Sequence, residues 1–336
     1  MKYSIIIATY NRASDLRETL RSIACLSSSG EWEVIVVDNN SRDNTREVVL
    51  DAAREFPTDL RYIFEAEQGR SAALNAGIRA SRGEIILTTD DDVRIEPDWM
   101  EAAARALVSL DCDYVGGKVL PIWGGARPRW LPNRGGKHWA VIALLDYGPE
   151  PVAFGHQVPI GVNMAFRREA FRRAGLWDNR VGRKAGTLLG QEVREWGLRA
   201  KAAGLRGYYV PDMIVRHIIS ADRLKKRYFR RWFYWHGISR AMLYEQKRVD
   251  MEAPEQTTLD FSRVAHVLGV PRYMFRSCFR KCGDVFKAAL GGDAVATFEN
   301  ELWIWFFAGV VKQRWKDRKR QAAVEARVAE VAGSEQ

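Results

Sequence analysis

The first hundred residues alternate between two patterns, and this alternation restricts the fold more than any other feature of the sequence. Apolar runs rich in β-branched residues occupy 3–10 and 32–41, as expected for strands buried on both faces. Between them, Leu16, Leu20 and Ile23 recur at helical spacing. Strands that alternate with helices predict an α/β architecture, with a mostly parallel sheet flanked by helices.

Polar and acidic residues stand at the carboxyl ends of the predicted strands. They are the stretch 9–11 after the first strand, Asp38 at the end of the second, and Asp90, Asp91 and Asp92 after a later apolar run. In open parallel sheets, ligands lie beyond the carboxyl ends of the strands. This edge of the sheet is therefore a candidate site.

Three consecutive aspartates repel one another unless a cation compensates them. Mg²⁺ and Mn²⁺ prefer carboxylate oxygens and commonly share them with substrate phosphates. Side chains alternate along an extended chain, so Asp90 and Asp92 can serve different parts of one ligand. A solvated acidic turn is the alternative, but the strand-end position and the nearby Asp38 favour a metal diphosphate.

The net charge of +10 is concentrated in the last third of the chain. From Ser220 onward there are 22 Lys and Arg against 14 Asp and Glu, a net of +8. Residues 223–246 and 301–320 combine this charge with helical patterns and many aromatic side chains. We predict an α/β domain over 1–220 and a helical, basic, aromatic-rich extension over 221–336.

A basic extension favours an anionic partner, either membrane headgroups or nucleic acid. The run at 301–320 joins a mostly apolar half to a basic cluster. It is too short to span a bilayer, which takes about 20 apolar residues, but it is typical of a helix lying on an anionic leaflet. The alternative is a helix that packs on the first domain and ends in a solvated basic tail.

The N-terminus and the cysteines both indicate a cytoplasmic protein. Only Lys2 precedes the first apolar run, which is too short for a secretory signal. The four cysteines, Cys25, Cys112, Cys278 and Cys282, form no CxxC pair. We predict reduced thiols packed as small apolar groups.

The middle of the chain is less regular. Residues 115–139 are rich in Gly, Pro and Trp and are predicted to form a long ordered loop. Trp123, Trp130 and Trp139 suit either stacking on a sugar or filling the core beneath the loop. Residues 205–219 are predicted as a strand pair.

Four ordered motifs resemble those of family 2 glycosyltransferases with the GT-A fold. They are "SIIIATYNR", "VIVVDNNSRDNT", "QGRSAALNAGIRASRGEIILTTDDDV" and "YYVPDMIVRH", within roughly the first 220 residues. As an ordered set they are highly specific. The resemblance implies a Rossmann-like sheet and inverting transfer of a sugar from a nucleotide diphosphate, helped by Mg²⁺ or Mn²⁺.

By this resemblance, the first two strand ends bind the nucleotide. Thr9, Tyr10 and Asn11 would border it, and Asp38 would hold its base. Asp91 is assigned to the same nucleotide-sugar site.

The resemblance also implies a metal and diphosphate site. Asp90 and Asp92 form the Asp-x-Asp element, with Asp92 as the metal ligand and Asp90 nearer the ribose and the metal. His217 matches a histidine that approaches the metal or the diphosphate in some relatives, although a strand-end histidine is often structural. Asn75 falls on the motif's asparagine. Leu74 stands where many members carry arginine, so one diphosphate contact is missing or supplied elsewhere.

Inverting transfer needs a general base that removes the proton of the attacking hydroxyl. The family places it in a Gly-Glu-Asp-like motif that opens a helix, and here this stretch reads "GTLLGQEVREWGLR". In one register Glu192 takes the position of the base. In the other Val193 does, and it cannot act as one. Glu192 is our first candidate and Glu195 the second, while an ordinary i,i+4 pair of Glu195 with Arg199 is the alternative.

These features predict an inverting, metal-dependent glycosyltransferase with a hydroxyl acceptor on a lipid-linked or cell-envelope glycan. A sugar nucleotidyltransferase is the alternative enzyme, but "ATYNRASD" lacks a Gly-rich, basic phosphate loop. No GxGxxG follows the first strand, which disfavours a dinucleotide oxidoreductase. A non-catalytic protein that binds through its basic C-terminus is the remaining alternative.

The expected partners follow from this function. The donor would be a UDP-, GDP- or dTDP-linked sugar, because Asp38 is compatible with more than one base. We expect contact with an anionic membrane surface and none with nucleic acid. The protein would then lie in the cytoplasm, at the inner face of the cell membrane.

Overall fold

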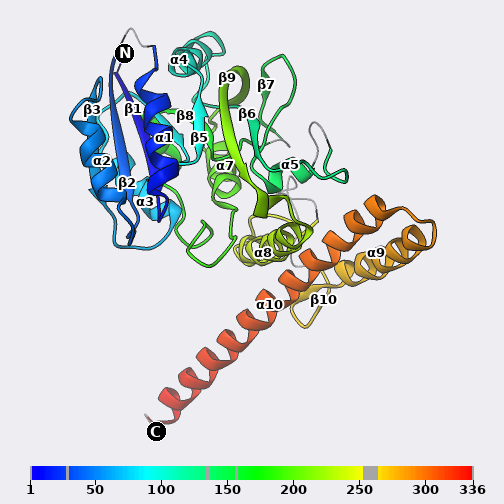
Figure 1. Ribbon diagram of the computed structural model, residues 1–336. Coiled ribbons are helices and arrows are strands. Elements are labelled where there is room, and N and C mark those ends of the chain that lie inside the picture. Colours follow the sequence, from blue (N-terminus) through cyan, green and yellow to red (C-terminus); the bar gives the residue numbers. More distant parts are fainter. Residues whose placement is uncertain (1, 28–29, 133–136, 156–157, 253–263, 335–336) are drawn as a thin grey trace. The chain divides into compact units, whose positions relative to one another are not determined.

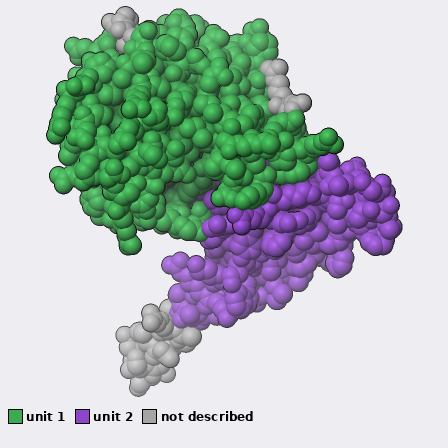
Figure 2. All heavy atoms as spheres, viewed as in Figure 1, with its two compact units in different colours: residues 1–187, 192–225 green, residues 188–191, 226–336 purple. Residues whose placement is uncertain are grey.

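The computed structural model describes residues 2–27, 30–132, 137–155, 158–252 and 264–334. The chain forms two compact units, coloured separately in Figure 2. Unit 1 comprises residues 1–187 and 192–225, and unit 2 comprises residues 188–191 and 226–336. The division into an α/β domain over 1–220 and an extension over 221–336 stays a prediction.

Unit 1 contains the alternating strands and helices expected from the sequence (Figure 1). In chain order its elements are β1 (Lys2–Thr9), α1 (Ala13–Ala24), β2 (Glu31–Asp38), α2 (Thr45–Ala53), β3 (Asp59–Phe64), α3 (Arg70–Ala80), β4 (Ile85–Thr89), β5 (Val93–Ile95), α4 (Trp99–Ser109), β6 (Tyr114–Gly124), α5 (Lys137–Val141), β7 (Val152–Ala153), β8 (Asn163–Arg167), α6 (Arg168–Ala174), α7 (Glu192–Ala202), β9 (Gly207–Ser220) and the 3-10 helix η1 (Ala221–Leu224).

A single large sheet organises unit 1, which confirms the α/β fold class. Among the described residues it has nine strands in the order β3-β2-β1-β4-β8-β6-β9-β5, and β7 also pairs with β9. The first four strands in this order are parallel, and β8 runs antiparallel to both of its neighbours. The sheet is therefore parallel where strand and helix patterns alternate most regularly in the sequence, and it is mixed beyond β4.

Helices α3, α6 and α7 pack into the core cluster that covers one face of this sheet. Gly77 lets α3 lie close to β1, since a Cβ atom there would come within 2.4 Å of the Ile6 side chain. Trp196 of α7 is fully buried, and its ring centroid lies 5.1 Å from those of Tyr114 and Phe166. Aromatic packing thus fixes α7, the helix that carries both candidate bases, against the sheet.

The predicted long loop at 115–139 is wrong over its first part, which belongs to strand β6. Gly116 and Gly117 suggested a loop, but they lie where neighbouring segments approach closely. A Cβ atom at Gly117 would fall 2.0 Å from the carbonyl oxygen of Met213. Residues 133–136 of this segment lie outside the described residues.

The predicted strand pair at 205–219 is one strand, β9, with an irregularity in its middle. Opposite it, Gly117 pairs with Val210 but Lys118 pairs with Ile214. Pro211 lies in the skipped stretch, where a residue without an N–H removes a hydrogen bond of the ladder. In the sequence this stretch resembles a turn between two strands, but in the structure the strand continues through it.

The cysteines and tryptophans divide between core and surface. All four cysteines are free; Cys112 is buried as predicted, whereas Cys25 and Cys282 are exposed because they lie on outward helix faces or ends. Trp139 is buried, and its indole N–H donates to the carbonyl of Pro132 at 3.2 Å. Trp139 therefore fills the core, while Trp123 and Trp130 are half-buried.

Unit 2 is helical over most of its described length. Its elements are α8 (Lys226–Glu245), β10 (His266–Val267), β11 (Val270–Pro271), α9 (Arg272–Leu290) and α10 (Ala294–Ser334). Helices α8 and α10 approach closely at two glycines. A Cβ atom at Gly237 would lie 2.0 Å from the Phe306 carbonyl, and one at Gly309 would lie 1.9 Å from the Tyr234 carbonyl.

The apolar run at 301–310 packs inside unit 2. Leu302, Phe306 and Val310 are buried, and the last two belong to a core cluster with residues of α8 and α9. The buried face of this run thus packs against other elements of unit 2, and both predictions for the run, contact with an anionic membrane and packing on the first domain, stay predictions. Within the described ranges, none of the helices combines the length and apolar character needed to cross a membrane.

Candidate active site

The carboxyl ends of β1, β2 and β4 meet at one edge of the sheet, as predicted. Thr9 pairs with Asp38 in the parallel register of β1 and β2, and Ile7 pairs with Thr89 in that of β1 and β4. Asp90 follows Thr89 directly. The strand register therefore brings residues from three separate motifs to one place.

His217 reaches this edge through the short strand β5. Val93 of β5 lies opposite His217 of β9 in an antiparallel pairing, and the N–H of Ile218 donates to the carbonyl of Asp92 at 2.9 Å. From α1, the buried hydroxyl of Thr19 accepts a hydrogen bond from the N–H of Val93 at 3.1 Å. Bonds from both sides fix the turn that carries the aspartates.

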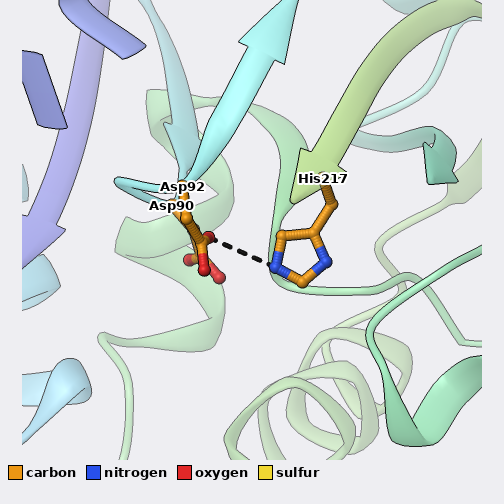
Figure 3. A group of neighbouring side chains, drawn as sticks. All are labelled: Asp90, Asp92 and His217. Atoms are coloured by element: carbon orange, nitrogen blue, oxygen red, sulfur yellow. Dashed lines mark ion pairs between the residues drawn. The ribbon is translucent and has the colours of Figure 1, made fainter. Parts of the chain in front are cut away.

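Asp90, Asp92 and His217 point toward one another (Figure 3). One potential ligand atom from each lies within 4.8 Å of the others. Asp92 and His217 are buried, and Asp90 is half-buried. Two carboxylates and an imidazole arranged in this way form a possible site for a divalent cation.

Neither a proton nor a lone pair on Nε2 lets the imidazole of His217 satisfy all of its neighbours. Its Nδ1 lies 3.1 Å from the carbonyl oxygen of Ile142, which can only accept, so Nδ1 carries a proton. Its Nε2 lies 3.0 Å from Nη1 of Arg223 and 3.2 Å from Oδ1 of Asp92. A proton on Nε2 would face the Arg223 donor, whereas a lone pair there would face the carboxylate of Asp92.

A metal ion fits this arrangement. Among the described residues, Oδ1 of Asp92 is buried and accepts no hydrogen bond. A cation bound by Oδ1 and Nε2 would satisfy both atoms, and the bond from Nδ1 to Ile142 already sets the tautomer that leaves Nε2 free to coordinate. The donor set of carboxylates with one imidazole suits Mg²⁺ or Mn²⁺.

Three arginines lie close to the aspartates and offset the repulsion between the carboxylates. Nη1 of Arg12 donates to Asp92 at 2.5 Å, and Nη2 of Arg70 donates to Asp90 at 2.8 Å. Nη2 of Arg223 lies 3.4 Å from Asp92. The sequence interpretation missed all three, although Arg12 ends the motif "SIIIATYNR" and Arg70 stands within "QGRSAAL".

These cations keep two of the aspartates ionised. Burial raises the pKa of Asp90, but the guanidinium of Arg70 and the imidazole of His217 together outweigh it and hold this pKa below its usual range. Burial also raises the pKa of Asp92, but His217, Arg12 and Arg223 together outweigh burial and hold that pKa far below its usual range. Both carboxylates are therefore ready to bind a cation at neutral pH.

Asp91 is buried and bonds to the end of β1. It accepts hydrogen bonds from the hydroxyl of Thr9 at 2.8 Å and from Arg12 at 3.1 Å. Burial raises its pKa to about 7 against the effect of Arg12. Asp91 ties β1 to the acidic turn, and its predicted place in the nucleotide-sugar site stays a prediction.

The other predicted nucleotide contacts lie where β1 and β2 end. Asp38 is buried and accepts from the N–H of Ser41 at 2.9 Å and from the hydroxyl of Tyr62 at 2.8 Å. Asn11 is exposed with a positive φ of 52°, and Tyr10 beside it is half-buried. The geometry collects these residues at the predicted edge, while their contacts with a nucleotide stay predictions.

Asn75 and Leu74 both have structural surroundings. The amide nitrogen of Asn75 donates to the carbonyl of Trp177 at 2.9 Å, and its oxygen accepts from the Trp177 N–H at 3.0 Å. Leu74 of α3 is fully buried in the core, where an arginine would lose its hydration. One turn earlier on the same helix, Arg70 supplies the cation that the resemblance led us to seek at Leu74.

The start of α3 aims Arg70 at the site. The N–H of Gly69 donates to the side-chain oxygen of Asn39 at 2.7 Å, and the N–H of Arg70 donates to the carbonyl of Arg183 at 2.8 Å. Gly69 has a φ of 150°, a conformation that other residues rarely adopt. Nη2 of Arg70 also donates to the carbonyl of Gly161 at 2.8 Å, so the guanidinium is held from several directions.

Glu192 opens α7 beside this arginine. Its Oε1 lies 3.6 Å from Nη1 of Arg70, whose other nitrogens bind Asp90. Its Oε2 is buried and accepts no hydrogen bond from the described residues. Burial raises the pKa of Glu192, and Arg70 offsets this only in part. The first candidate base is thus a buried carboxylate with one oxygen uncommitted.

Glu195 is paired with an arginine of its own helix. Its two oxygens accept from Nε and Nη2 of Arg199, both at 2.8 Å, and the carboxylate is buried. Arg199 also donates to the carbonyl of Leu176 at 2.7 Å. The alternative i,i+4 pair is confirmed, although Glu195 is buried and Arg199 half-buried, unlike in an ordinary exposed pair.

Known proteins with similar sequences are glycosyltransferases. The family model of glycosyl transferase family 2 matches residues 4–175. A glucosyl-dolichyl phosphate glucuronosyltransferase of Haloferax volcanii is 26% identical over 265 residues, which are 75% of this chain and 82% of that protein. An undecaprenyl-phosphate 4-deoxy-4-formamido-L-arabinose transferase of Pseudomonas fluorescens is 37% identical over 151 residues, 43% of this chain and 44% of that protein.

Solved structures show the same fold. A mannosyltransferase of Pyrobaculum calidifontis, in complex with GDP-Man and Mn²⁺, superposes with a TM-score of 0.61. The match covers 94% of this chain and 87% of that one, at 19% sequence identity. At this identity the likeness establishes the fold and leaves the ligands to be argued from the site itself.

Proposed function

The chain belongs to glycosyl transferase family 2 and is a glycosyltransferase, and from this premise we propose that it transfers a sugar with inversion from a nucleotide diphosphate to a hydroxyl of a lipid-linked or cell-envelope glycan. One observation carries the proposal: the buried Oδ1 of Asp92 accepts no hydrogen bond from the described residues and lies 3.2 Å from Nε2 of His217. These two atoms call for a cation at the edge of the sheet where a diphosphate would lie.

We propose that Asp92, Asp90 and His217 hold Mg²⁺ or Mn²⁺. When bound, the metal would neutralise the diphosphate and improve it as a leaving group. The coordinating atoms are the two carboxylates, kept ionised by Arg70 and Arg12, and the imidazole whose tautomer Ile142 sets. That a similar fold is known with Mn²⁺ and GDP-Man supports this choice of ligand class.

The nucleotide would extend from the metal toward the ends of β1 and β2. In this proposal Thr9, Tyr10 and Asn11 border it, and Asp38 holds its base. The bonds that Asp38 accepts from Ser41 and Tyr62 orient this carboxylate. The proposed donor is a UDP-, GDP- or dTDP-linked sugar, because Asp38 is compatible with more than one base.

Glu192 is the proposed general base. It would take the proton of the acceptor hydroxyl while the hydroxyl oxygen bonds to the anomeric carbon and the bond from that carbon to the diphosphate breaks. Burial raises its pKa and so increases its proton affinity, and Arg70 opposes part of this rise. Glu195, the second candidate, would first have to leave Arg199, which holds both of its oxygens.

The acceptor is proposed from the relatives. One is named for a glucosyl-dolichyl phosphate and another for undecaprenyl phosphate, both of which are lipid-linked. A polyprenyl phosphate attacks through an oxygen that carries no proton at neutral pH, whereas a glycan hydroxyl needs a base. The uncommitted carboxylate of Glu192 favours the hydroxyl. We further propose that the enzyme works at the cytoplasmic face of the membrane, where such acceptors are anchored.

A donor and acceptor screen tests the proposal. The chain would be incubated with UDP-, GDP- and dTDP-sugars, Mn²⁺ or Mg²⁺, and either a polyprenyl phosphate or a polyprenyl-linked sugar in detergent. We expect metal-dependent transfer to the lipid-linked sugar. Transfer that is unaffected by a chelator would contradict the metal, and transfer to the bare phosphate alone would contradict the acceptor.

A further inference from the structure

Helix α9 of unit 2 presents an apolar face to solvent. Phe279 is 79% exposed, Phe286 66% and Leu290 75%. The spacings of seven and four residues put these side chains on one face of the helix. The exposed Cys282 lies on the same face. A row of large apolar side chains in water is costly and marks an interaction surface.

The opposite face of α9 is held in the core of unit 2. Met274 and Ser277 are buried, and the ring of Phe275 lies 5.2 Å from that of Phe307 on α10. Nζ of Lys281 donates to the side chain of Asn300 at 2.8 Å. Because α10 anchors α9 in this orientation, the exposed row cannot turn inward without breaking these contacts.

Cations border the exposed row. Arg276, Arg280 and Lys287 are exposed and recur at spacings of four and seven residues, along one side of the apolar stripe. Over its whole length α9 carries five basic residues and one acidic residue, Asp284, which lies 3.6 Å from Lys281. The face thus combines an apolar row with a positive margin.

We propose that this face of α9, defined by Phe279, Phe286, Leu290 and the cations Arg276, Arg280 and Lys287, docks the enzyme on an anionic lipid bilayer. The apolar row would enter the boundary between headgroups and acyl chains, and the cations would contact lipid phosphates. Charge complementarity selects a bilayer over a second copy of the chain, because two such faces would oppose their positive margins. The inference rests on the proposed lipid-linked acceptor, which would place substrate in the same membrane.

This surface differs from the one that the sequence suggested. Phe306 and Val310, in the apolar run at 301–310, are buried in unit 2. Trp315 on α10 is 51% exposed, but Lys312 and Lys319 lie over its ring at 5.5 and 3.9 Å from the centroid. The exposed aromatic rings of α9 carry no such cations in the part of the chain that the structure describes.

Co-sedimentation of the full-length protein with vesicles tests the docking. The vesicles contain equal parts of phosphatidylcholine and phosphatidylglycerol, and the variant carries Phe279→Ser and Phe286→Ser. We expect binding to fall at least about tenfold, since each exposed phenylalanine would lose its transfer into the interface. Replacing Arg276, Arg280 and Lys287 by Gln should weaken binding about fivefold for each cation.

Matched controls separate docking from other causes. Leu50→Ser with Val108→Ser removes two exposed apolar side chains of unit 1, and Trp315→Ser removes one of α10; both should bind like the wild type. Unchanged binding by the α9 variant, equal wild-type binding to pure phosphatidylcholine, or a lipid-independent dimer that the α9 variant abolishes would each overturn the proposal. Thermal unfolding by circular dichroism checks that every variant folds.

The test distinguishes this inference from the proposed function. The α9 variant should still transfer sugar to an acceptor dissolved in detergent, because α9 carries none of the proposed catalytic residues. A wild type that binds vesicles but transfers nothing would defeat the proposed function and leave the docking intact. A wild type that transfers sugar in detergent but ignores the α9 changes in the vesicle assay would defeat the docking alone.

Discussion

Asp90 and Glu192 share the guanidinium of Arg70 but lie in surroundings with opposite effects. Burial raises the pKa of both carboxyl groups. At Asp90, Arg70 donates two hydrogen bonds and, together with His217, outweighs burial, so the pKa falls. At Glu192, Arg70 lies 3.6 Å away and burial prevails, so the pKa rises.

This difference assigns separate tasks to the strand-end turn and to the start of α7. A carboxylate that stays ionised suits a metal ligand, whereas one with a raised pKa suits a group that takes up a proton near neutral pH. Arg70 links them, so its position sets both. Removing one carboxylate at a time tests whether the two groups have separate tasks, and removing the arginine tests whether it acts on both.

The largest expected effect comes from the strand-end turn. Asp92→Asn should lower kcat/KM by at least about a thousandfold, because a neutral amide is a weaker ligand for a hard cation and leaves His217 without its partner. Transfer assays with saturating Mn²⁺ measure it, with Asp98→Asn, an exposed aspartate, as control. Turnover within tenfold of the wild type would remove Asp92 from the metal site.

The start of α7 should give the next largest effect. Glu192→Gln should reduce kcat with a hydroxyl acceptor by about a hundredfold to ten-thousandfold, the usual contribution of a general base. The rate of transfer to a phosphate acceptor should change little, and so should binding of the nucleotide-sugar donor. Glu195→Gln is the matched comparison: it should lower the free energy of unfolding by about 2 kcal/mol, since it leaves the half-buried Arg199 without its charged partner. A larger loss of kcat from Glu195→Gln would reverse the assignment.

Removing the shared cation should have an intermediate effect with a characteristic pH signature. Arg70→Gln should lower kcat/KM by about tenfold to a hundredfold. Arg70 lowers the pKa of both Asp90 and Glu192, so its loss should raise both. The acidic limb of kcat against pH, where Glu192 becomes protonated and activity falls, should therefore move to higher pH. An acidic limb that moves to lower pH contradicts the shared role of Arg70.

A buried carboxylate outside the site should affect stability alone. Glu33 accepts from Ser4 and Arg61 and from the backbone of Arg82, and these bonds outweigh burial and lower its pKa to about 2 from 4.5. Its stabilising effect is thus present above pH 4.5 and lost as pH falls toward 2. Glu33→Gln should cost about 2 kcal/mol at pH 7 and nearly nothing at pH 2. Urea unfolding at both values measures this, and an equal loss at both would exclude the charge.

The sequence predicted the features that depend on local patterns. Apolar runs that stop at polar residues located the strand ends at Thr9, Asp38 and Asp90, and parallel pairing then required these ends to meet. The order of the four motifs was enough to identify the family. The α/β fold class and the edge that holds the acidic turn followed from short-range signals alone.

What the sequence did not predict depends on contacts between distant segments. The guanidinium of Arg223 reaches Asp92 only because β5 pairs with β9. The sequence left two registers of the base motif open. In the structure α7 begins at Glu192, which lies beside Arg70, and this separates Glu192 from Glu195. Gly117 suggested a loop because the close approach of Met213 cannot be read from composition.

Binding of Mn²⁺ tests the central claim most directly. Mn²⁺ would be titrated into the full chain with UDP or GDP while the signal of free Mn²⁺ is followed by electron paramagnetic resonance. We predict one nucleotide-dependent Mn²⁺ site in the wild type, lost in Asp92→Asn and in His217→Gln and kept in Asp98→Asn. Wild-type Mn²⁺ binding in Asp92→Asn would contradict the claim that the strand-end aspartates hold the metal diphosphate.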